Sequence, residues 1–418
     1  MKSDLLEQYI PAPDEHLEES DSRIAFAVKL GSALHKYGTS THRLEQAMNL
    51  VLKKIGLNGH FFSTPTGIFA SFGLPEEHRT SLIRAEPGEV NLEKLALLHD
   101  LTGQVIKGDI ASAAGEKQVD DIVAAPPRYG PLLHALCFGL VSGASSRFLG
   151  GGWRETVAAA IIGLILGGLA YVVGRSENAS QVFDPMAAMI AAALAMVAAQ
   201  FFLPLSIYVT TLAGLIVLVP GLTLTTAMTE LATRNLVSGT ARLMGAGLIF
   251  LEIGFGVALG GQIKKLLPPV PLFASPEPLA PWTLGVALLI SPLALSVLLR
   301  AHPRDIGWIL IASIISFGGS RAGASLLGPE LGAFVGATLV GSVSNLYGRW
   351  LNRPAAVTLV PSILLLVPGS IGFGSLSKFI ERDVVSGVET AFIMVLVAVA
   401  LATGLLVANL IVPPRKAL

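Results

Sequence analysis

The chain has 418 residues, of which 52% are hydrophobic and only 14% are charged. Soluble domains carry about 25% charged residues, so this composition indicates a membrane protein. The formal net charge is zero and no block of basic residues stands out, which argues against a nucleic-acid partner. The single cysteine, Cys137, lies in an apolar run and can form no intrachain disulfide.

Residues 1–127 carry most of the acidic side chains and no long apolar run, so we expect them to form a soluble domain. The chain opens with an acidic, polar run that lacks the basic start, apolar core and cleavage site of a secretory signal. We therefore expect a cytoplasmic N-terminus. Two five-span membrane repeats, 128–266 and 267–418, are expected to follow.

The soluble part reads as a small α+β domain. Residues 18–55 predict two helices separated at Tyr37 and Gly38, with an apolar face on the second. The runs "HFFSTPTGIFASFG" and "TSLIRAEP" predict strands, and helices are expected from Leu92 and from Ile110.

Polar side chains gather near the turns of this domain and form a candidate site. They are His35, Tyr37, His42, Arg43, Glu45, Thr64 and Thr66. Folding and capping duties are the simpler explanation for them. No HExxH, CxxC or GxSxG pattern is present, so the sequence assigns neither a metal ligand nor a nucleophile.

Ten apolar segments are long enough to be considered as membrane spans. They are 130–148, 154–174, 184–203, 205–220, 241–263, 281–299, 305–320, 329–347, 355–368 and 388–411. With both termini inside, the cytoplasmic loops would hold Arg175, Arg234, Arg242, Arg300, Arg304, Arg349, Arg353, Arg415 and Lys416, as the positive-inside rule requires. Basic residues on the predicted outer side weaken this orientation: Arg147, Arg154, Lys264, Lys265, Arg321, Lys378 and Arg382.

Two stretches repeat one another at an offset of 148 residues. "LVPGLTLTTAMTELATRNLVSG" starts at Leu218 and "LVPGSIGFGSLSKFIERDVVSG" starts at Leu366. Five predicted spans separate a helix from its counterpart, so the two copies would point in opposite directions. We therefore expect about ten transmembrane helices arranged as a five-plus-five inverted repeat, an arrangement that recurs in secondary transporters.

Each VPG is expected to break a helix, because proline removes a backbone hydrogen bond and glycine relaxes the chain. The polar residues that follow could then meet a solute, and loose amides at a helix start suit a carboxylate. The candidate substrate-binding residues are Pro220, Gly221, Thr223, Thr225, Thr226, Pro368, Gly369, Ser370 and Ser375. Alternatively, each VPG ends a span at the interface and the hydroxyls cap an amphipathic helix.

Glu252 lies near the middle of a predicted span, and its repeat counterpart is Ala400. An ionisable group inside a span is costly and indicates function, so Glu252 is the candidate proton carrier. His134 could join such a relay, although a lone histidine on an apolar helix is more often structural. Asp184 and Glu389 lie at span ends, where acidic residues are ordinary.

Gly328, Gly332 and Gly336 follow one another at a spacing that favours close helix packing. Neither the P-loop pattern nor the dinucleotide-binding glycine pattern is present. We therefore expect no ATP-driven motor in this chain and no cofactor.

The segment "HKYGTSTHRLEQAMNLVLKKIGLNGHFFSTPTGIFASFG" resembles the threonine/serine exporter (ThrE) family, whose YG-x-x-x-x-R-x-E element is matched by Tyr37, Gly38, Arg43 and Glu45. The resemblance implies a fused form of a two-component exporter in the cell inner membrane. It implies export of threonine and serine driven by the proton motive force, whereas split relatives are associated with dicarboxylate (succinate) export.

These observations favour a secondary active exporter that works by proton-coupled alternating access. Its partners would be a small solute, protons and the bilayer, and the sequence does not indicate an oligomeric state. Two other classes stay open: a membrane-anchored hydrolase that uses the soluble domain, and a channel or sensor gated by a ligand of that domain.

Overall fold

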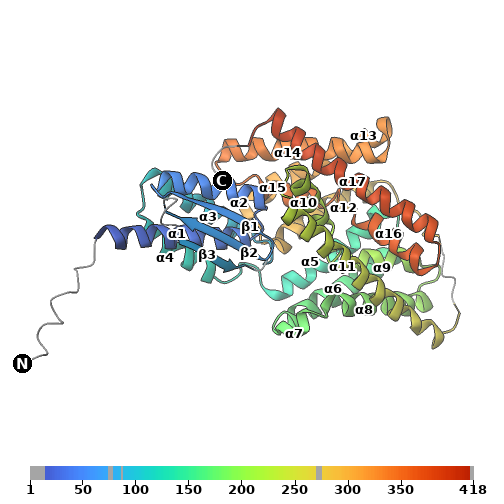
Figure 1. The fold of residues 1–418 in the computed structure, drawn as a ribbon. Helices are drawn as coiled ribbons and strands as arrows, with labels where there is room; N and C mark the ends of the chain where they lie inside the picture. Colours follow the sequence, from blue (N-terminus) through green and yellow to red (C-terminus); the bar gives the residue numbers. More distant parts are fainter. Residues whose placement is uncertain (1–14, 74–78, 86–87, 270–274, 415–418) are drawn as a thin grey trace, which may run out of the picture. The chain divides into compact units, whose positions relative to one another are not determined.

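A computed structural model describes residues 15–73, 79–85, 88–269 and 275–414 (Figure 1). The chain divides into two compact units. The small unit runs to Pro126, and the membrane unit begins at Pro127 and also takes in Asn91–Glu93. Arg415 and Lys416, which were expected to mark the cytoplasmic side, lie outside the described residues.

The described part of the small unit contains four helices and three strands. Its elements are α1 (Glu15–Lys36), α2 (Thr41–Lys54), β1 (Gly59–Thr64), β2 (Gly67–Phe72), β3 (Arg79–Arg84), α3 (Leu92–Lys107) and α4 (Ser112–Ala124). The strands form an antiparallel sheet in the order β1-β2-β3. These elements agree with the expected α+β domain, and the strands cover both runs that the alternating pattern predicted.

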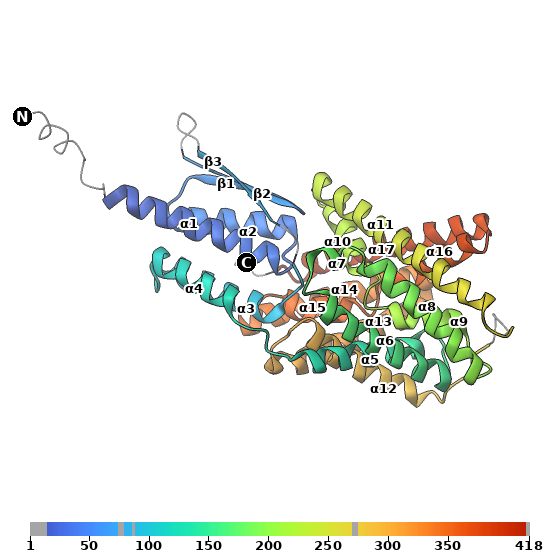
Figure 2. The same cartoon turned by 90° about the horizontal axis from the view of Figure 1, so that it is seen from below.

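One face of this sheet packs on the helices. Phe61, Ile68, Ala70 and Phe72 are buried on it, because alternate side chains of a strand point to the same face. Figure 2 shows the sheet on one side of α1 and α2, with α4 on the other side of α1. The hydrophobic core of the unit therefore lies between the sheet and α1 and α2.

The membrane unit is entirely helical among the described residues. Its helices are α5 (Pro131–Phe148), α6 (Trp153–Val173), α7 (Glu177–Ser180), α8 (Phe183–Phe201), α9 (Ile207–Leu215), α10 (Gly221–Ala232), α11 (Leu236–Gly260), α12 (Trp282–Leu298), α13 (Ile306–Leu327), α14 (Pro329–Leu351), α15 (Ala356–Ile363), α16 (Gly369–Ile380) and α17 (Val384–Ile411), with short 3₁₀ turns η1 (Gly261–Lys265) and η2 (Pro303–Asp305).

Among the residues that the structure describes, six helical segments are long and apolar enough to cross a bilayer. They are Trp153–Val173, Phe183–Phe201, Leu236–Lys265, Pro303–Leu327, Pro329–Leu351 and Val384–Ile411. The class of mainly helical membrane protein is thereby confirmed, but the count of ten spans is not. Helix α12 is a shorter apolar helix of 17 residues, and the segments 205–220 and 355–368 contain helices of only 9 and 8 residues.

Glycines set the close approach of neighbouring membrane helices, as the spacing of Gly332 and Gly336 predicted. A Cβ atom on Gly332 would lie 2.6 Å from the Ser320 carbonyl oxygen, and one on Gly336 would lie 2.8 Å from Ser320 Cβ. Both glycines of α14 therefore face α13. Gly328 instead has a φ of 95° and forms the turn between these two helices.

The helices of the two halves follow one another with nearly constant spacing. Helices α10 and α16 have 12 residues each, and their starts, Gly221 and Gly369, are 148 residues apart. The starts of α11 and α17, Leu236 and Val384, are also 148 residues apart. The links before them hold Arg234 and Arg382, both with a φ of 66°. The duplication seen in the sequence thus extends to helix boundaries and to individual backbone angles.

Gly256 of α11 and Gly404 of α17 occupy equivalent positions, and substitutions there test the packing of these helices. A Cβ atom would lie 2.2 Å from the Pro185 carbonyl oxygen at Gly256 and 2.6 Å from the Phe334 carbonyl oxygen at Gly404. We expect Gly256→Val and Gly404→Val each to destabilise the protein by about 1–3 kcal/mol through overpacking. Thermal unfolding in detergent measures this, and Gly247→Val is the control, since nothing lies within 4 Å of Gly247. Equal losses in all three variants would contradict the packing.

Candidate transport site at the paired helix breaks

Two pairs of short helices are each separated by a break at VPG. Helix α9 ends at Leu215 and α10 starts at Gly221, while α15 ends at Ile363 and α16 starts at Gly369. Proline has no N–H for the helical ladder, so Pro220 and Pro368 stand at the start of the second helix of each pair, where that group is not needed. A helix of 9 residues is about 14 Å long and cannot cross a hydrocarbon layer of about 30 Å.

The two breaks contact each other. A Cβ atom on Gly221 would lie 1.8 Å from Val367 Cγ1, and one on Gly369 would lie 2.6 Å from Val219 Cγ1. Each glycine therefore faces the valine that precedes the proline of the other motif. Such a reciprocal contact is what a two-fold relation between the motifs produces.

Each helix that follows a break packs on the last long helix of the other half. Leu224 and Met228 of α10 lie in one apolar cluster with Ala398 and Ala402 of α17. At the equivalent positions of the other pair, Gly372 of α16 faces Phe250 of α11, where a Cβ atom would lie 2.6 Å from Phe250 Cζ. The four helices α10, α11, α16 and α17 thus join the two halves in matching register.

The hydroxyl groups near the breaks fall into two sets. Thr225 and Ser375 are buried and donate hydrogen bonds to main-chain carbonyls, those of Gly221 at 3.1 Å and of Gly387 at 2.7 Å. These two serve the helices. Thr223, Thr226 and Ser370 are half-buried, and within the described residues their hydroxyls have no hydrogen-bond partner. The structure therefore leaves Thr223, Thr226 and Ser370 as the better placed of the candidate binding groups.

Equivalent polar pairs of different chemistry connect each of these helices to the next. Arg242 Nε lies 3.0 Å from Glu230 Oε2, and the Glu230 side chain is 1% exposed. At the counterpart positions, Lys378 Nζ donates to Thr390 Oγ1 at 2.8 Å. Arg242 was expected in a loop, and the ion pair was not predicted. The two residues lie 12 positions apart on successive helices, and such a spacing leaves no periodic pattern in the sequence.

Glu252 is half-buried on α11, and its charge acts on the carboxyl group of Asp184 at the start of α8. Four residues after Glu252, Gly256 meets Pro185, the neighbour of Asp184. Asp184 was expected to be an ordinary acidic residue at the end of a span, and its interaction with Glu252 was not predicted. His134 lies on α5, which packs on α6, α9 and α12, whereas α11 packs on α8, α10 and α16. The structure thus brings Glu252 together with Asp184 and not with His134.

Tyr208 is a further aromatic group at the junction of the two halves. Its ring on α9 lies 5.8 Å from that of Phe373 on α16, measured between centroids. A Cβ atom on Gly374 would lie 3.1 Å from the Tyr208 hydroxyl oxygen. No sequence motif marks Tyr208, so only the contacts between helices reveal it.

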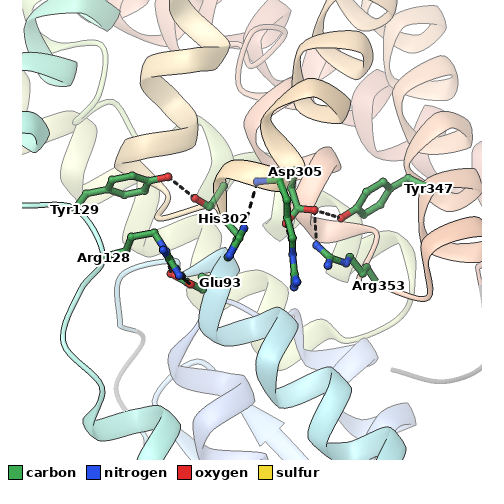
Figure 3. A network of polar contacts seen from close by, with 9 residues as sticks. Glu93, Arg128, Tyr129, His302, Asp305, Tyr347 and Arg353 are labelled. Atoms are coloured by element: carbon green, nitrogen blue, oxygen red, sulfur yellow. Dashed lines mark hydrogen bonds and ion pairs between the residues drawn. The ribbon is translucent and has the colours of Figure 1, made fainter.

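A buried acid near the start of the second long helix of each half holds the link that leads into the broken helix pair. Glu155 Oε1 accepts a hydrogen bond of 2.8 Å from the Ser206 N–H, just before α9. Asp305 accepts one of 2.5 Å from Arg353 Nη1 and one of 2.9 Å from the Tyr347 hydroxyl (Figure 3). In both halves an acid thereby fixes the link that leads into a broken helix pair.

Around the same α12–α13 link, further polar contacts hold the start of the membrane unit (Figure 3). Arg128 forms a two-pronged ion pair with Glu93, and the Tyr129 hydroxyl donates to the Ala301 carbonyl at 2.7 Å. His302 Nδ1 accepts from the Arg304 N–H, which requires a neutral ring. Desolvation, with the charges of Arg304 and Arg128, lowers the pKa of His302 and favours that form.

In the small unit, most candidate residues have structural duties. His35 Nε2 lies 3.0 Å from the Pro65 carbonyl oxygen, and Glu45 accepts from the Ser63 N–H at 2.8 Å. The Tyr37 ring lies under Lys94, and Thr64 donates to the Gly67 carbonyl across the β1–β2 turn. Thr66 is exposed at that turn.

His42 and Arg43 stand apart, because no described contact occupies them. No group of three or more His, Cys, Asp or Glu residues in the described part of the chain could hold a metal ion.

Long apolar helices and two helix pairs broken at a shared motif define a membrane transport protein. Residues 25–264 match the family model described as "Putative threonine/serine exporter", and residues 285–411 match the one described as "Threonine/Serine exporter, ThrE". The chain belongs to the threonine/serine exporter family, in which both parts are here joined in one polypeptide.

Curated proteins that the chain resembles include membrane proteins of yeasts. A pheromone-regulated membrane protein 10 from Candida albicans (strain WO-1) is 29% identical over 393 residues, which cover 90% of this chain and 34% of the relative. The protein of that name from Saccharomyces cerevisiae (strain YJM789) is 25% identical, with coverage of 90% and 49%. The chain thus spans a third to a half of the length of these relatives. No solved structure matches.

The contact between the two breaks can be tested by crowding it and then relieving it. We expect Gly221→Ala and Gly369→Ala each to lower transport and thermal stability, because the new methyl group has no room beside the opposing valine. Val367→Ala should rescue Gly221→Ala and leave Gly369→Ala unrescued. Rescue of both variants, or of neither, would contradict the reciprocal contact. Gly245→Ala, where nothing lies within 4 Å, is the control.

The Glu230–Arg242 pair predicts energetic coupling. Glu230→Gln leaves the half-buried Arg242 charge without its partner and should destabilise the protein by about 1–3 kcal/mol. The double variant with Arg242→Gln should lose much less than the sum of the single variants. Reversible denaturant unfolding measures this cycle, with exposed Arg234→Gln as control. Simple additivity would show that the two side chains do not interact.

Proposed function

We propose that this protein is a secondary active exporter of small hydroxy amino acids, threonine and serine, which works by proton-coupled alternating access of two inverted five-helix halves. The carrying observation is the contact of the two VPG breaks between Val219 and Gly369 and between Val367 and Gly221. In transporters with repeats, discontinuous helices at the repeat interface form the solute site.

Substrate recognition follows from what the breaks expose. The first turn of a helix has N–H groups without intrahelical acceptors, and its dipole favours negative charge. The starts of α10 and α16 would hold the substrate carboxylate. Thr223, Thr226 and Ser370 would bond its hydroxyl and amino groups, since these three side chains have no partner among the described residues.

Proton coupling is assigned to Glu252 together with Asp184. An ionisable side chain within a membrane helix is costly and by default indicates function. Their interaction between α8 and α11 supports this assignment, since α11 also packs on α16 of the other half. Loading and release of a proton here would therefore act on a helix that bears on the solute site. His134, on α5, stays a separate candidate for the proton pathway.

The orientation of the chain in the membrane is proposed from the sequence repeat together with the distribution of basic residues. An odd number of crossings in each half would place Arg234 and Arg382, which have the same backbone conformation, on opposite sides. Both termini would then be cytoplasmic, and a bacterial host would carry the chain in its inner membrane.

Transport in proteoliposomes loaded with threonine, serine or succinate, with and without a proton gradient, tests the substrate. We expect gradient-stimulated flux of threonine and serine. Succinate flux alone would assign the chain to dicarboxylate export. Absence of flux for all three solutes would contradict an exporter of this substrate class.

Glu252→Gln tests the coupling. We expect gradient-driven flux to fall at least tenfold while gradient-independent exchange of the substrate continues, because the variant cannot change its charge. Asp184→Asn should weaken the gradient dependence in the same direction. Glu389→Gln, at an exposed acid of α17, is the matched control. Full gradient dependence in Glu252→Gln would overturn the assignment.

A further inference from the structure

The turn between α1 and α2 in the small unit collects polar side chains. Helix α1 ends at Lys36, Gly38 follows with a φ of 97°, and the Thr39 N–H bonds back to the Leu34 carbonyl at 3.1 Å. This is the usual glycine-terminated helix end. Helix α2 then starts at Thr41, so the segment between the helices is short and its shape is fixed.

Three polar groups of this turn have no partner among the described residues. Thr39 Oγ1 and His42 Nδ1 are shielded from solvent without a hydrogen bond, and the Arg43 guanidinium has neither a hydrogen bond nor an ion pair. Arg43 is nonetheless desolvated, and this lowers its pKa. Desolvation and the neighbouring Arg43 charge also lower the pKa of His42. Unpaired, desolvated cations are unusual because burial of a charge is costly.

The start of α2 adds main-chain donors to the same place. Its first helical hydrogen bond runs from the Leu44 N–H to the Ser40 carbonyl, and the Ser40 side chain makes no capping bond. The main-chain N–H groups of His42 and Arg43 come before this first bond and therefore have no acceptor within the helix. Side chains of a helix lean toward its N-terminus. His42 and Arg43 stand in the first turn of α2, directly after Thr39 and Ser40, and the Arg43 charge acts on the His42 ring.

We propose that this turn is a binding site for a small oxyanion, held by the Arg43 guanidinium, His42 Nδ1, Thr39 Oγ1 and the main-chain N–H groups of His42 and Arg43. Every group named can donate a hydrogen bond, and no carboxylate among the described residues competes for Arg43. A carboxylate or a phosphate would supply the missing negative charge. Glu45 does not, because it is engaged with the Ser63 N–H.

A binding role and a structural role for Arg43 predict opposite changes in stability. If Arg43 held the fold together, its replacement would destabilise the protein in the absence of anions. Because its guanidinium is unpaired, Arg43→Gln should leave the unliganded protein as stable or make it more stable. The loss should appear only in the response to the anion.

The test uses the full chain in detergent and titrates it with sodium phosphate, sodium acetate and L-threonine, while thermal unfolding and calorimetry are followed. We expect at least one of these probes to raise the melting temperature and to bind at least tenfold more weakly to Arg43→Gln. Arg43→Lys should bind with intermediate affinity, since lysine keeps the charge but lacks the planar, two-pronged set of donors of a guanidinium. Lys54→Gln, an exposed cation in the last turn of α2, is the matched control.

The three probes separate the sources of the anion. Binding of phosphate alone marks a phosphate site, whereas binding of acetate or threonine marks a carboxylate site. Equal binding by Arg43→Gln and the unaltered chain, or no binding of any probe, would overturn the proposal. A lower melting temperature of Arg43→Gln without any anion would assign Arg43 a structural role instead. Transport is not part of this readout, so failure of the proposed export activity would leave the result intact.

Discussion

A helix broken inside a bilayer exposes backbone groups that lipid cannot satisfy, so the break must be covered by protein or must line a cavity. Here the two breaks contact each other. Gly221 and Gly369 leave room for the valines of the opposite motif, at separations that no added Cβ atom would allow. This contact fixes the positions of α10 and α16, which then pack on α17 and α11 of the other half. The candidate transport site exists because of this one close approach.

Chemistry differs between the halves while the backbone repeats. Glu230–Arg242 and Lys378–Thr390 occupy equivalent positions, as one ion pair and one neutral acceptor bound by a lysine. Glu252 faces no acidic counterpart, since Ala400 stands at the equivalent position. A symmetric scaffold with unequal polar groups can reach two related conformations of different charge distribution. This is the property that our proposal for coupled transport requires.

The sequence was sufficient to predict features that depend on local rules. Alternating apolar residues predicted the sheet, and proline with glycine predicted both helix breaks. The count of ten spans stays a prediction, because an apolar run such as 205–220 does not reveal how much of it is helical. Side-chain pairing was beyond reach: Thr225 and Thr226 look alike in sequence, yet only Thr225 bonds to its own helix. Asp184 beside Glu252, and Arg43 without a partner, depend on contacts between distant elements.

The central claim is that the two halves lie in opposite orientations around the crossed VPG breaks. Single cysteines introduced as Arg234→Cys and Arg382→Cys in a Cys137→Ser background test it, because both arginines are exposed in equivalent links and Cys137 is the chain's one cysteine. Labelling sealed, uniformly oriented vesicles with a membrane-impermeant maleimide should modify only one of the two positions from outside, and the other only after permeabilisation. Modification of both positions from the same side would contradict the inverted arrangement.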